Sequence, residues 1–310
     1  MKIVILDAKT LGEADLSPIK SFGEFQIYQT TRPDETLARC ENADIVLTNK
    51  VVLDAPILKQ LPKLKLICVT ATGTNIIDLQ TAKEQGIAVK NVAGYSTKSV
   101  AQHTLTLALN LMSKIGYYDH YCKSGEWCKS DVFMHINGGL RELDGKEWGI
   151  IGLGNIGKEV AKIAQAFGTH ISYTSTSGKN TDNTYPQKSL KDLLEQSDII
   201  SIHAPLNEKT KNLITAKELA CLKEGAILIN AGRGGIVNEK DLAKTLESKN
   251  IFFGADVLEV EPMVAGHPFL NPVIADKIIL TPHIAWAYEN ARKKLLQMVI
   301  ENIESFVRDY

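Results

Sequence analysis

The chain has 310 residues, of which 44% are hydrophobic and 23% are charged. At about 150 residues per domain this length predicts two domains, and the composition excludes a wholly disordered chain. The 35 Lys and Arg residues balance 36 Asp and Glu residues, and no block of five or more like charges occurs. This balance argues against a nucleic-acid partner.

The N-terminus and the cysteines bear on the compartment. The apolar run in MKIVILDAKT is too short for a signal-peptide core or a membrane span, so we expect a cytoplasmic protein without membrane contact. The five cysteines are odd in number and form no C-x-x-C motif, which argues against a disulfide framework or a structural zinc site. The seven histidines show no metal-ligand spacing, so no metal is expected.

In the first part of the chain, short β-branched runs alternate with stretches of helical spacing. The runs predict strands over 3–7, 25–29, 44–48, 65–70 and 87–91. A helix is predicted over 75–85, closed by Gly86. A long and mostly buried helix should run from Ser99 to about Tyr118, followed by loop material rich in glycine and polar residues.

The alternation then resumes. Strands are predicted over 149–151, 171–174, 199–203, 226–230, 253–257 and 278–280, and a final helix over 289–309 carries an apolar stripe. This pattern indicates the α/β class, with two doubly wound parallel-sheet domains and a cleft between them. We expect the final helix to pack back on the first half, giving one domain over 1–98 plus 288–310 and another over 99–287.

The strongest local motif is the G-x-G-x-x-G of Gly152 to Gly157. It directly follows a predicted strand and opens a helix that runs to Phe167. In a dinucleotide-binding fold, Gly152 allows the tight turn, Gly154 lets the backbone approach a pyrophosphate, and Gly157 allows close packing of helix and strand. The alternative interpretation is a glycine-rich turn without a ligand.

The same fingerprint predicts an acidic residue about 20 residues further on, for the adenosine ribose. The strand that ends at Thr174 is followed instead by Ser175-Thr176-Ser177-Gly178-Lys179. Hydroxyl groups and a cation there tolerate a 2′-phosphate that a carboxylate would repel, so we expect NADPH to be accepted. The alternative, that the acid comes from elsewhere in the chain, stays open.

Three further polar residues each follow a predicted strand of the second half. These are Arg233, Glu261 and His283. A cation, a carboxylate and an imidazole at the carboxyl ends of parallel strands can supply a substrate clamp, an orienting partner and an acid/base. Taken singly, each is more simply an ordinary polar loop residue.

Over nearly its whole length the sequence resembles the D-isomer-specific 2-hydroxyacid dehydrogenases. The motifs that carry the resemblance are, in chain order, Thr72-Gly73-Thr74-Asn75 with Asp78, Asn91 to His103, Gly152 to Gly157, His203-Ala204-Pro205-Leu206, Asn230 to Gly235, Asp256 to Pro262, and Pro282 to Ala287. Within the family, the sequence is most similar to the glycerate dehydrogenases, also called hydroxypyruvate reductases.

The resemblance implies a flavodoxin-like and a Rossmann domain and a hydride transfer between NAD or NADP and a small 2-keto or D-2-hydroxy acid. Hydroxypyruvate and D-glycerate are the favoured pair. The family's members are usually dimers, and a homodimer is expected. The same resemblance extends to carboxy-terminal-binding-protein corepressors, in which this scaffold binds other proteins, but the intact set of Arg233, Glu261 and His283 favours an enzyme.

The resemblance also assigns roles to individual residues. Arg233 binds the substrate, Glu261 partners the catalytic acid and His283 is that acid. The amides near Thr72, Gly73 and Thr74 face the substrate carboxylate, and Asp256 lies beside the nicotinamide carboxamide. Tyr95 and Trp286 are expected to line the substrate pocket, although Trp286 is equally well explained as a hydrophobic plug. The cofactor-binding residues expected in all are Gly152, Gly154, Asn155, Ile156, Gly157, Thr174, Ser175, His203, Ala204, Pro205, Ala231, Gly232 and Asp256.

Overall fold

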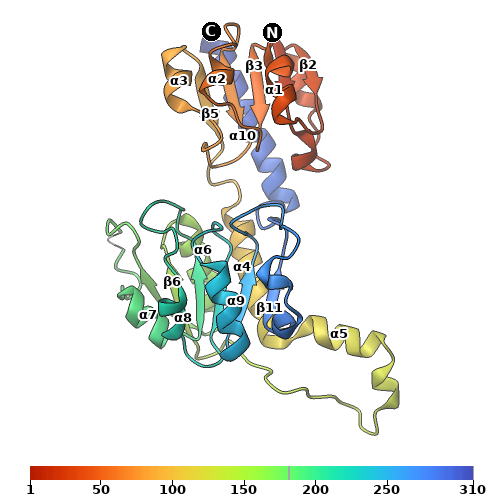
Figure 1. Ribbon diagram of the computed structural model, residues 1–310, viewed down its shortest axis with the longest axis vertical. Coiled ribbons are helices and arrows are strands. Elements are labelled where there is room, and N and C mark those ends of the chain that lie inside the picture. The colour runs from red at the N-terminus through yellow and green to blue at the C-terminus, as the bar shows by residue number, and fades with distance from the viewer. Residues whose placement is uncertain (181, 310) are drawn as a thin grey trace. The chain divides into compact units, whose positions relative to one another are not determined.

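The computed structural model describes residues 1–180 and 182–309, which divide into two compact units (Figure 1). Unit 1 consists of Met1–Ser96 together with the described chain from Trp286 onward, and unit 2 consists of Thr97–Ala285. The expected boundaries were residues 98 and 288, whereas unit 1 breaks off after residue 96 and resumes at residue 286. Each unit is an α/β fold built on a parallel sheet.

The sheet of unit 1 has the strand order β2-β1-β3-β4-β5, which is the order of flavodoxin-like folds. Its central strands are apolar runs buried at every position, because helices cover both faces of the sheet. The strands are β1 Lys2–Ile5, β2 Glu24–Ile27, β3 Ile45–Thr48, β4 Leu66–Val69 and β5 Ala88–Asn91. The sequence predictions for these strands are confirmed to within two residues at each end.

Helices from both ends of the chain cover this sheet. They are α1 Pro33–Cys40, α2 Ala55–Leu58, α3 Leu79–Glu84 and the C-terminal α10 Glu289–Asp309, with short 3₁₀ helices η1 Ala8–Leu11 and η2 Ser17–Phe22. The apolar stripe of α10 is buried against the strands, and Figure 1 shows this helix beside the N-terminal elements. Lys90 fixes it further by donating from Nζ to Ser305 Oγ over 3.1 Å.

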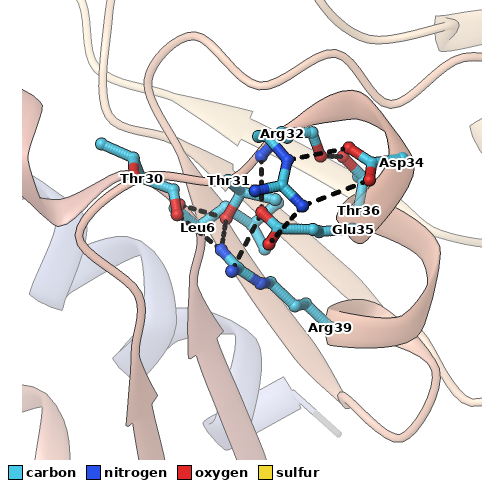
Figure 2. Close-up of polar contacts among 8 residues, drawn as sticks. All are labelled: Leu6, Thr30, Thr31, Arg32, Asp34, Glu35, Thr36 and Arg39. Atoms are coloured by element: carbon cyan, nitrogen blue, oxygen red, sulfur yellow. Dashed lines mark hydrogen bonds and ion pairs between the residues drawn. The ribbon is translucent and has the colours of Figure 1, made fainter.

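A polar network closes the loop between β2 and α1 (Figure 2). The Arg39 guanidinium lies 3.0 Å from the Glu35 carboxylate and donates to Thr31 Oγ1 over 2.7 Å. Thr31 in turn donates to the carbonyl of Leu6, just after β1. Arg39 also lies over the Tyr28 ring at 4.2 Å. The start of α1 is thereby fixed to the carboxyl end of the sheet.

A buried carboxylate occupies the point of unit 1 where the strand order reverses, between β1 and β3. Asp7 follows β1 and is 4% exposed. Its side chain accepts the backbone N–H groups of Asn49, Lys50 and Val51, which follow β3, over 2.6 to 3.3 Å. The amide groups at this point are therefore satisfied within the unit.

The sheet of unit 2 has the order β11-β10-β9-β8-β6-β7. On the free edge of β7, Tyr173 forms one isolated parallel β-bridge with Gln187, which belongs to no strand. The strands are β6 Glu147–Ile151, β7 His170–Thr174, β8 Ile199–Ile202, β9 Ile227–Asn230, β10 Phe252–Ala255 and β11 Ile278–Leu280. Here too the predicted strands are confirmed to within two residues at each end.

Helices cover both faces of this sheet as well. They are α4 Thr97–Ser113, α6 Asn155–Ala166, α7 Leu190–Gln196, α8 Ala216–Ala220 and α9 Glu239–Ser248, with the short η4 Pro268–Leu270 and η5 Pro272–Lys277. Leu105, Leu107, Ala108 and Leu111 of α4 are buried in one core with strand and α6 residues. The segments that directly follow β8, β9, β10 and β11 carry the polar residues of the predicted site.

The long helix predicted from Ser99 to Tyr118 is wrong in one respect, because it breaks at Lys114. This residue takes a left-handed conformation at φ 52°, after which α5 Ile115–Lys123 and η3 Glu126–Lys129 project from unit 2 (Figure 1). The Lys114 ammonium donates to the carbonyls of Asn137 and Gly138 over 3.1 and 2.8 Å. The residue at the break is thus bound to a segment more than 20 residues further along the chain.

The projecting segment is also more apolar at its surface than a polar loop would be. Its exposed residues include Phe133, which is 85% exposed, and Ile136, which is 63% exposed.

The helix predicted over 75–85 is shorter than expected as well, because Asp78 caps it by accepting the N–H of Thr81 over 2.8 Å. Among the described residues, no helix is long and apolar enough to cross a membrane.

Candidate active site

A cavity of about 670 Å³ opens in unit 2 where β6 and β8 lie side by side. Strand order reverses at this point, and in open α/β sheets such a point is where nucleotides bind. The lining comes from the turn after β6, the loop after β7 and the loop after β8. The lining residues are Gly152, Leu153, Gly154, Ser175, Thr176, Ser177, Lys179, Asn180, His203, Ala204, Pro205, Asn207, Glu208 and Lys209.

The three fingerprint glycines occupy three different environments. Gly152 has φ 94°, and a Cβ there would lie 2.9 Å from the Ala204 nitrogen. A Cβ on Gly157 would lie 2.4 Å from the Gly152 oxygen, so this glycine allows α6 to pack on the turn. A Cβ on Gly154 would meet nothing within 4 Å. The space in front of Gly154 is thus open, as the approach of a pyrophosphate requires.

The donor groups around this opening fit a dinucleotide. Helix α6 begins just after Gly154 and has no side-chain cap, so its first N–H groups and the positive end of its dipole are available to an anion. Of the predicted cofactor-binding residues, Gly152, Gly154, Ser175, His203, Ala204 and Pro205 line the cavity. The others, Asn155, Ile156, Gly157, Thr174, Ala231, Gly232 and Asp256, are not among its lining residues.

His203 has an unusual environment within this cavity. Both ring nitrogens are buried and have no hydrogen-bond partner in the described chain. Burial lowers the pKa of His203 to about 3, because the interior disfavours the charged imidazolium. The ring is therefore neutral at ordinary pH, and its unpartnered nitrogens in a cofactor-sized cavity fit contact with a bound group.

The loop after β7 holds hydroxyl groups and no acid in the place of the ribose-binding carboxylate. Ser175 Oγ accepts the N–H of Gly178 over 3.1 Å and Ser177 Oγ accepts that of Lys179 over 3.2 Å. Two residues that the sequence analysis missed, Glu208 and Lys209, line the same cavity from the loop after β8. Glu208 is therefore a candidate for the ribose-binding acid that the sequence analysis left to another part of the chain. No local sequence motif identifies it.

Arg233 lies on a turn that follows β9. Asn230 shapes this turn by accepting the N–H of Gly232 over 3.1 Å and donating to the Arg233 carbonyl over 2.9 Å. The exposed guanidinium donates to the Gly232 carbonyl over 2.8 Å. Since a guanidinium carries five N–H donors in a planar fork, most of its capacity stays available for a carboxylate.

Glu261 and His283 form a direct pair, although 22 residues separate them in the sequence. His283 Nδ1 lies 2.6 Å from Glu261 Oε2, and Glu261 Oε1 accepts the N–H of Leu258 over 3.0 Å. A carboxylate only accepts, so Nδ1 carries the proton of this contact. The other ring nitrogen, Nε2, has no partner among the described residues and is left for chemistry.

Gly234 brings the loops of Arg233 and Glu261 together. A Cβ on Gly234 would lie 1.9 Å from the Leu258 oxygen and 2.5 Å from the Glu259 nitrogen. Only a residue without a side chain permits this approach of the two backbones. The three predicted catalytic residues are thus carried by neighbouring segments of unit 2.

Asp256 anchors the segment that carries His283. Its carboxylate is 2% exposed and accepts from Thr281 Oγ1 over 2.6 Å and from the N–H groups of Ile284 and Ala285 over 2.8 Å. The His283 N–H donates to the Asp256 carbonyl over 2.8 Å. His283 itself has φ 56°, and these bonds hold that uncommon conformation.

The predicted substrate-binding residues of unit 1 lie beyond β4 and β5. Two hydrogen bonds join the segment after β4 to the end of β5. Asn91 Nδ2 donates to the Thr72 carbonyl, and Thr72 Oγ1 donates to the Val92 carbonyl. The N–H groups of Gly73 and Thr74 have no acceptor among the described residues. Trp286 meets Tyr95 edge to face at 6.3 Å between ring centroids, and Tyr95 is 9% exposed in the core of unit 1.

Metal chemistry was not expected from the histidine spacing. Among the described residues, no group of three or more His, Cys, Asp or Glu side chains is placed to hold a metal ion.

Comparison with known proteins gives a consistent result. The family profile "D-isomer specific 2-hydroxyacid dehydrogenase, NAD binding domain" matches residues 105–285. A hydroxypyruvate reductase of Blautia hydrogenotrophica is 36% identical over 318 residues, covering 99% of this chain and 97% of the relative. The chain belongs to the D-isomer specific 2-hydroxyacid dehydrogenases.

Two further similarities support the assignment. A glycerate dehydrogenase of Methylorubrum extorquens is 38% identical over 311 residues, covering 99% of this chain and 96% of the relative. The structure of an acyclic imino acid reductase in complex with NADPH and D-arginine matches with a TM-score of 0.84 and 29% identity, covering 100% of this chain and 98% of the other.

Membership of the family assigns the class of reaction. The chain is an NAD-dependent oxidoreductase that transfers a hydride between a nicotinamide cofactor and a small 2-keto or 2-hydroxy acid. The residues that match the NAD-binding domain of the family, 105–285, all lie within unit 2.

Proposed function

We propose that this dehydrogenase interconverts hydroxypyruvate and D-glycerate. The pairing of His283 Nδ1 with Glu261 at 2.6 Å beside the Arg233 loop carries the proposal for the reaction. The names of the relatives from Blautia hydrogenotrophica and Methylorubrum extorquens support the choice of substrate. A site that pairs a substrate hydroxyl group also discriminates against the analogue without it.

The bound nicotinamide cofactor supplies or accepts the hydride. Arg233 holds the keto acid with its guanidinium fork, through the carboxylate and the reacting carbonyl. In reduction, His283 in its cationic form donates the Nε2 proton to the carbonyl oxygen as negative charge develops there. In oxidation, neutral His283 takes the hydroxyl proton at Nε2. Glu261 holds Nδ1–H in both directions and stabilises the cationic ring.

Unit 1 supplies further proposed substrate contacts. The N–H groups of Thr72, Gly73 and Thr74 bind the substrate carboxylate, a role that the unpaired N–H groups of Gly73 and Thr74 support. Tyr95 and Trp286, packed edge to face, form an aromatic wall. The residues of unit 2 proposed to bind the cofactor are those given by the sequence analysis, with Glu208 and Lys209 added.

NADPH is proposed as an accepted cofactor. The loop after β7 offers Ser175, Ser177 and Lys179 in place of a ribose-binding acid, and Lys209 adds a second cation to the cavity. The related imino acid reductase was solved with NADPH. Glu208 lines the same cavity, and its carboxylate would repel the 2′-phosphate of NADPH.

The cofactor proposal has its own test. Ser175→Asp restores a carboxylate beside the adenosine ribose and should move the kcat/KM ratio towards NADH by about tenfold, or ~1.4 kcal/mol. Steady-state kinetics with both reduced cofactors measure the ratio. A parent enzyme that uses NADH and shows no NADPH activity would contradict the proposal.

We also propose a cytoplasmic homodimer. The exposed apolar residues on and after α5 support a partner for that segment. The five cysteines are free thiols in the structure, as is usual for proteins of a reducing compartment.

A substrate panel tests the proposed reaction. Hydroxypyruvate, glyoxylate, pyruvate and phenylpyruvate are compared with both NADH and NADPH, and hydroxypyruvate is expected to have the highest kcat/KM. A preference for pyruvate or phenylpyruvate would assign a different 2-keto acid. Dinucleotide binding without reduction of any of the four acids would favour a binding role over an enzymatic one.

A further inference from the structure

A second histidine–carboxylate pair lies beside the catalytic loops of unit 2. Glu239 is the first residue of α9, and His267 precedes η4 and is 7% exposed. His267 Nε2 lies 2.9 Å from Glu239 Oε2, while Glu239 Oε1 accepts the N–H of Glu259 over 2.7 Å. Both oxygens of this carboxylate are therefore engaged with groups of the loop that connects β10 to η4.

The hydrogen bonds of His267 determine its tautomer. The N–H of Phe269 donates to His267 Nδ1 over 3.2 Å, so Nδ1 carries no proton and Nε2–H donates to Glu239. Glu239 thus faces two donors, the imidazole Nε2–H and the Glu259 N–H. A carboxylate accepts from both, whereas a carboxamide of the same shape has one acceptor oxygen and places an NH₂ group against the other donor.

The segment held by Glu239 is the one that carries the partner of the catalytic imidazole. Glu259 lies two residues before Glu261, and the neighbouring Leu258 N–H donates to Glu261 Oε1. Glu261 Oε2 in turn contacts His283 Nδ1. We propose that Glu239, oriented by His267, is a positioning residue that sets the backbone at Glu259 and thereby aims the Glu261 carboxylate at His283. The inference rests on the proposed function for its catalytic meaning.

The test uses a readout that does not need turnover. In ¹⁵N-histidine-labelled protein, long-range ¹H–¹⁵N spectra report which nitrogen of neutral His283 carries the proton. The parent should show the Nδ1–H tautomer, and Glu261→Gln should shift it towards Nε2–H. If Glu239 positions Glu261, Glu239→Gln produces the same shift. Glu247→Gln is the matched control, because Glu247 also lies on α9 and accepts from Asn271 over 2.6 Å, yet is expected to leave His283 unchanged.

A second variant keeps the test decisive if Glu239→Gln fails to fold. His267→Asn retains a side-chain acceptor for the Phe269 N–H and removes the donor to Glu239, so a smaller tautomer shift in the same direction is expected. A parent-like His283 spectrum in the folded variants would overturn the proposal. An Nε2–H tautomer in the parent would overturn it as well.

Kinetics then separate positioning from general stability. Glu239→Gln should lower kcat for keto-acid reduction by about tenfold while the NADH dissociation constant stays within twofold of the parent. In a double-mutant cycle, Glu239→Gln should add little to the loss caused by Glu261→Gln, because both act on one contact. Additive losses would contradict the proposal. A parent inactive on every keto acid would refute the proposed function, and the tautomer measurement would still decide this inference.

Discussion

Arg233 and His283 act at different stages of the proposed reaction. The guanidinium binds the acid in the ground state and in the transition state, whereas the His283 proton matters mainly as charge develops on oxygen. Arg233→Ala should therefore raise KM and lower kcat, and His283→Ala should mainly lower kcat, by at least ~100-fold. Steady-state reduction of hydroxypyruvate measures both constants.

Cofactor binding provides the control for these variants. Neither residue lines the dinucleotide cavity, so the NADH dissociation constant, followed by fluorescence, should stay close to that of the parent. Either variant turning over at the parental rate would remove that residue from the mechanism.

His203 gives a prediction about acid stability. Its folded-state pKa of about 3 lies below the ordinary value near 6.5. Between these two pH values the unfolded chain binds a proton at His203 and the folded chain does not, so acid favours unfolding. This one group should lower the free energy of unfolding by about 2 kcal/mol between pH 7 and pH 5. Urea titrations at the two pH values measure the difference, and His203→Met should reduce it.

An unchanged pH dependence in His203→Met would show that the neutral buried ring is not the cause. Loss of dinucleotide affinity in the same variant is the separate expectation for a residue that lines the cavity.

Single residues of the site differ in how far the sequence reveals them. Gly152, Gly154 and Gly157 are marked by a spacing that has a direct physical meaning, and Arg233, Glu261 and His283 by motifs typical of a family. Glu239 and His267 carry no such mark, because their role comes from hydrogen bonds between segments distant in the sequence. The use of Asp256 as an anchor for the His283 segment is likewise visible only in three dimensions.

At the scale of elements, the contact between the Arg233 and Glu261 loops is the most sensitive feature. Gly234→Ala would place a methyl group 1.9 Å from the Leu258 oxygen, so the backbone that holds Glu261 must move. A displacement of about 1 Å at a catalytic group is expected to lower kcat by ~10- to 100-fold. Gly116→Ala in α5 meets nothing within 4 Å and is the matched control.

A Gly234→Ala enzyme with parental kcat would show that the loop relaxes without disturbing Glu261. Crystallographic comparison of the Glu261–His283 distance in the variant and the parent would show which of the two holds.

Strand positions are predictable from sequence here because the central strands are short apolar runs, rich in β-branched residues, that helices bury on both faces. Helix ends are less so. The apolar periodicity continues past Lys114, so the break there is invisible locally, and the contacts of its ammonium with Asn137 and Gly138 come from a distant segment. The start of α3 depends in the same way on the Asp78 cap.

At the scale of the whole molecule, the segment that begins with α5 should mediate dimer formation. Phe133 and Ile136 are 85% and 63% exposed, and large exposed apolar groups in one segment typically mark an interface. The double variant Phe133→Ser/Ile136→Ser should sediment as a monomer under conditions in which the parent sediments as a dimer. Val273→Ser, at an apolar residue of η5 that is 68% exposed, should not change the sedimentation.

A monomeric parent would contradict the proposed homodimer, and a dimeric double variant would place the interface elsewhere. Sedimentation-velocity experiments over a range of concentrations distinguish these outcomes.

The two sheets share an arrangement of neighbouring strands, but their reversal points are used differently. In unit 1 the Asp7 carboxylate fills that position and satisfies the amides of residues 49 to 51, whereas in unit 2 the turn at Gly154 is open. The amides at the reversal point of unit 1 are therefore already hydrogen-bonded to a carboxylate of the chain itself, whereas the turn of unit 2 leaves room for the approach of a phosphate. We therefore expect a dinucleotide phosphate to bind at the turn of unit 2 and not at the amides of residues 49 to 51, where it would have to displace the Asp7 carboxylate.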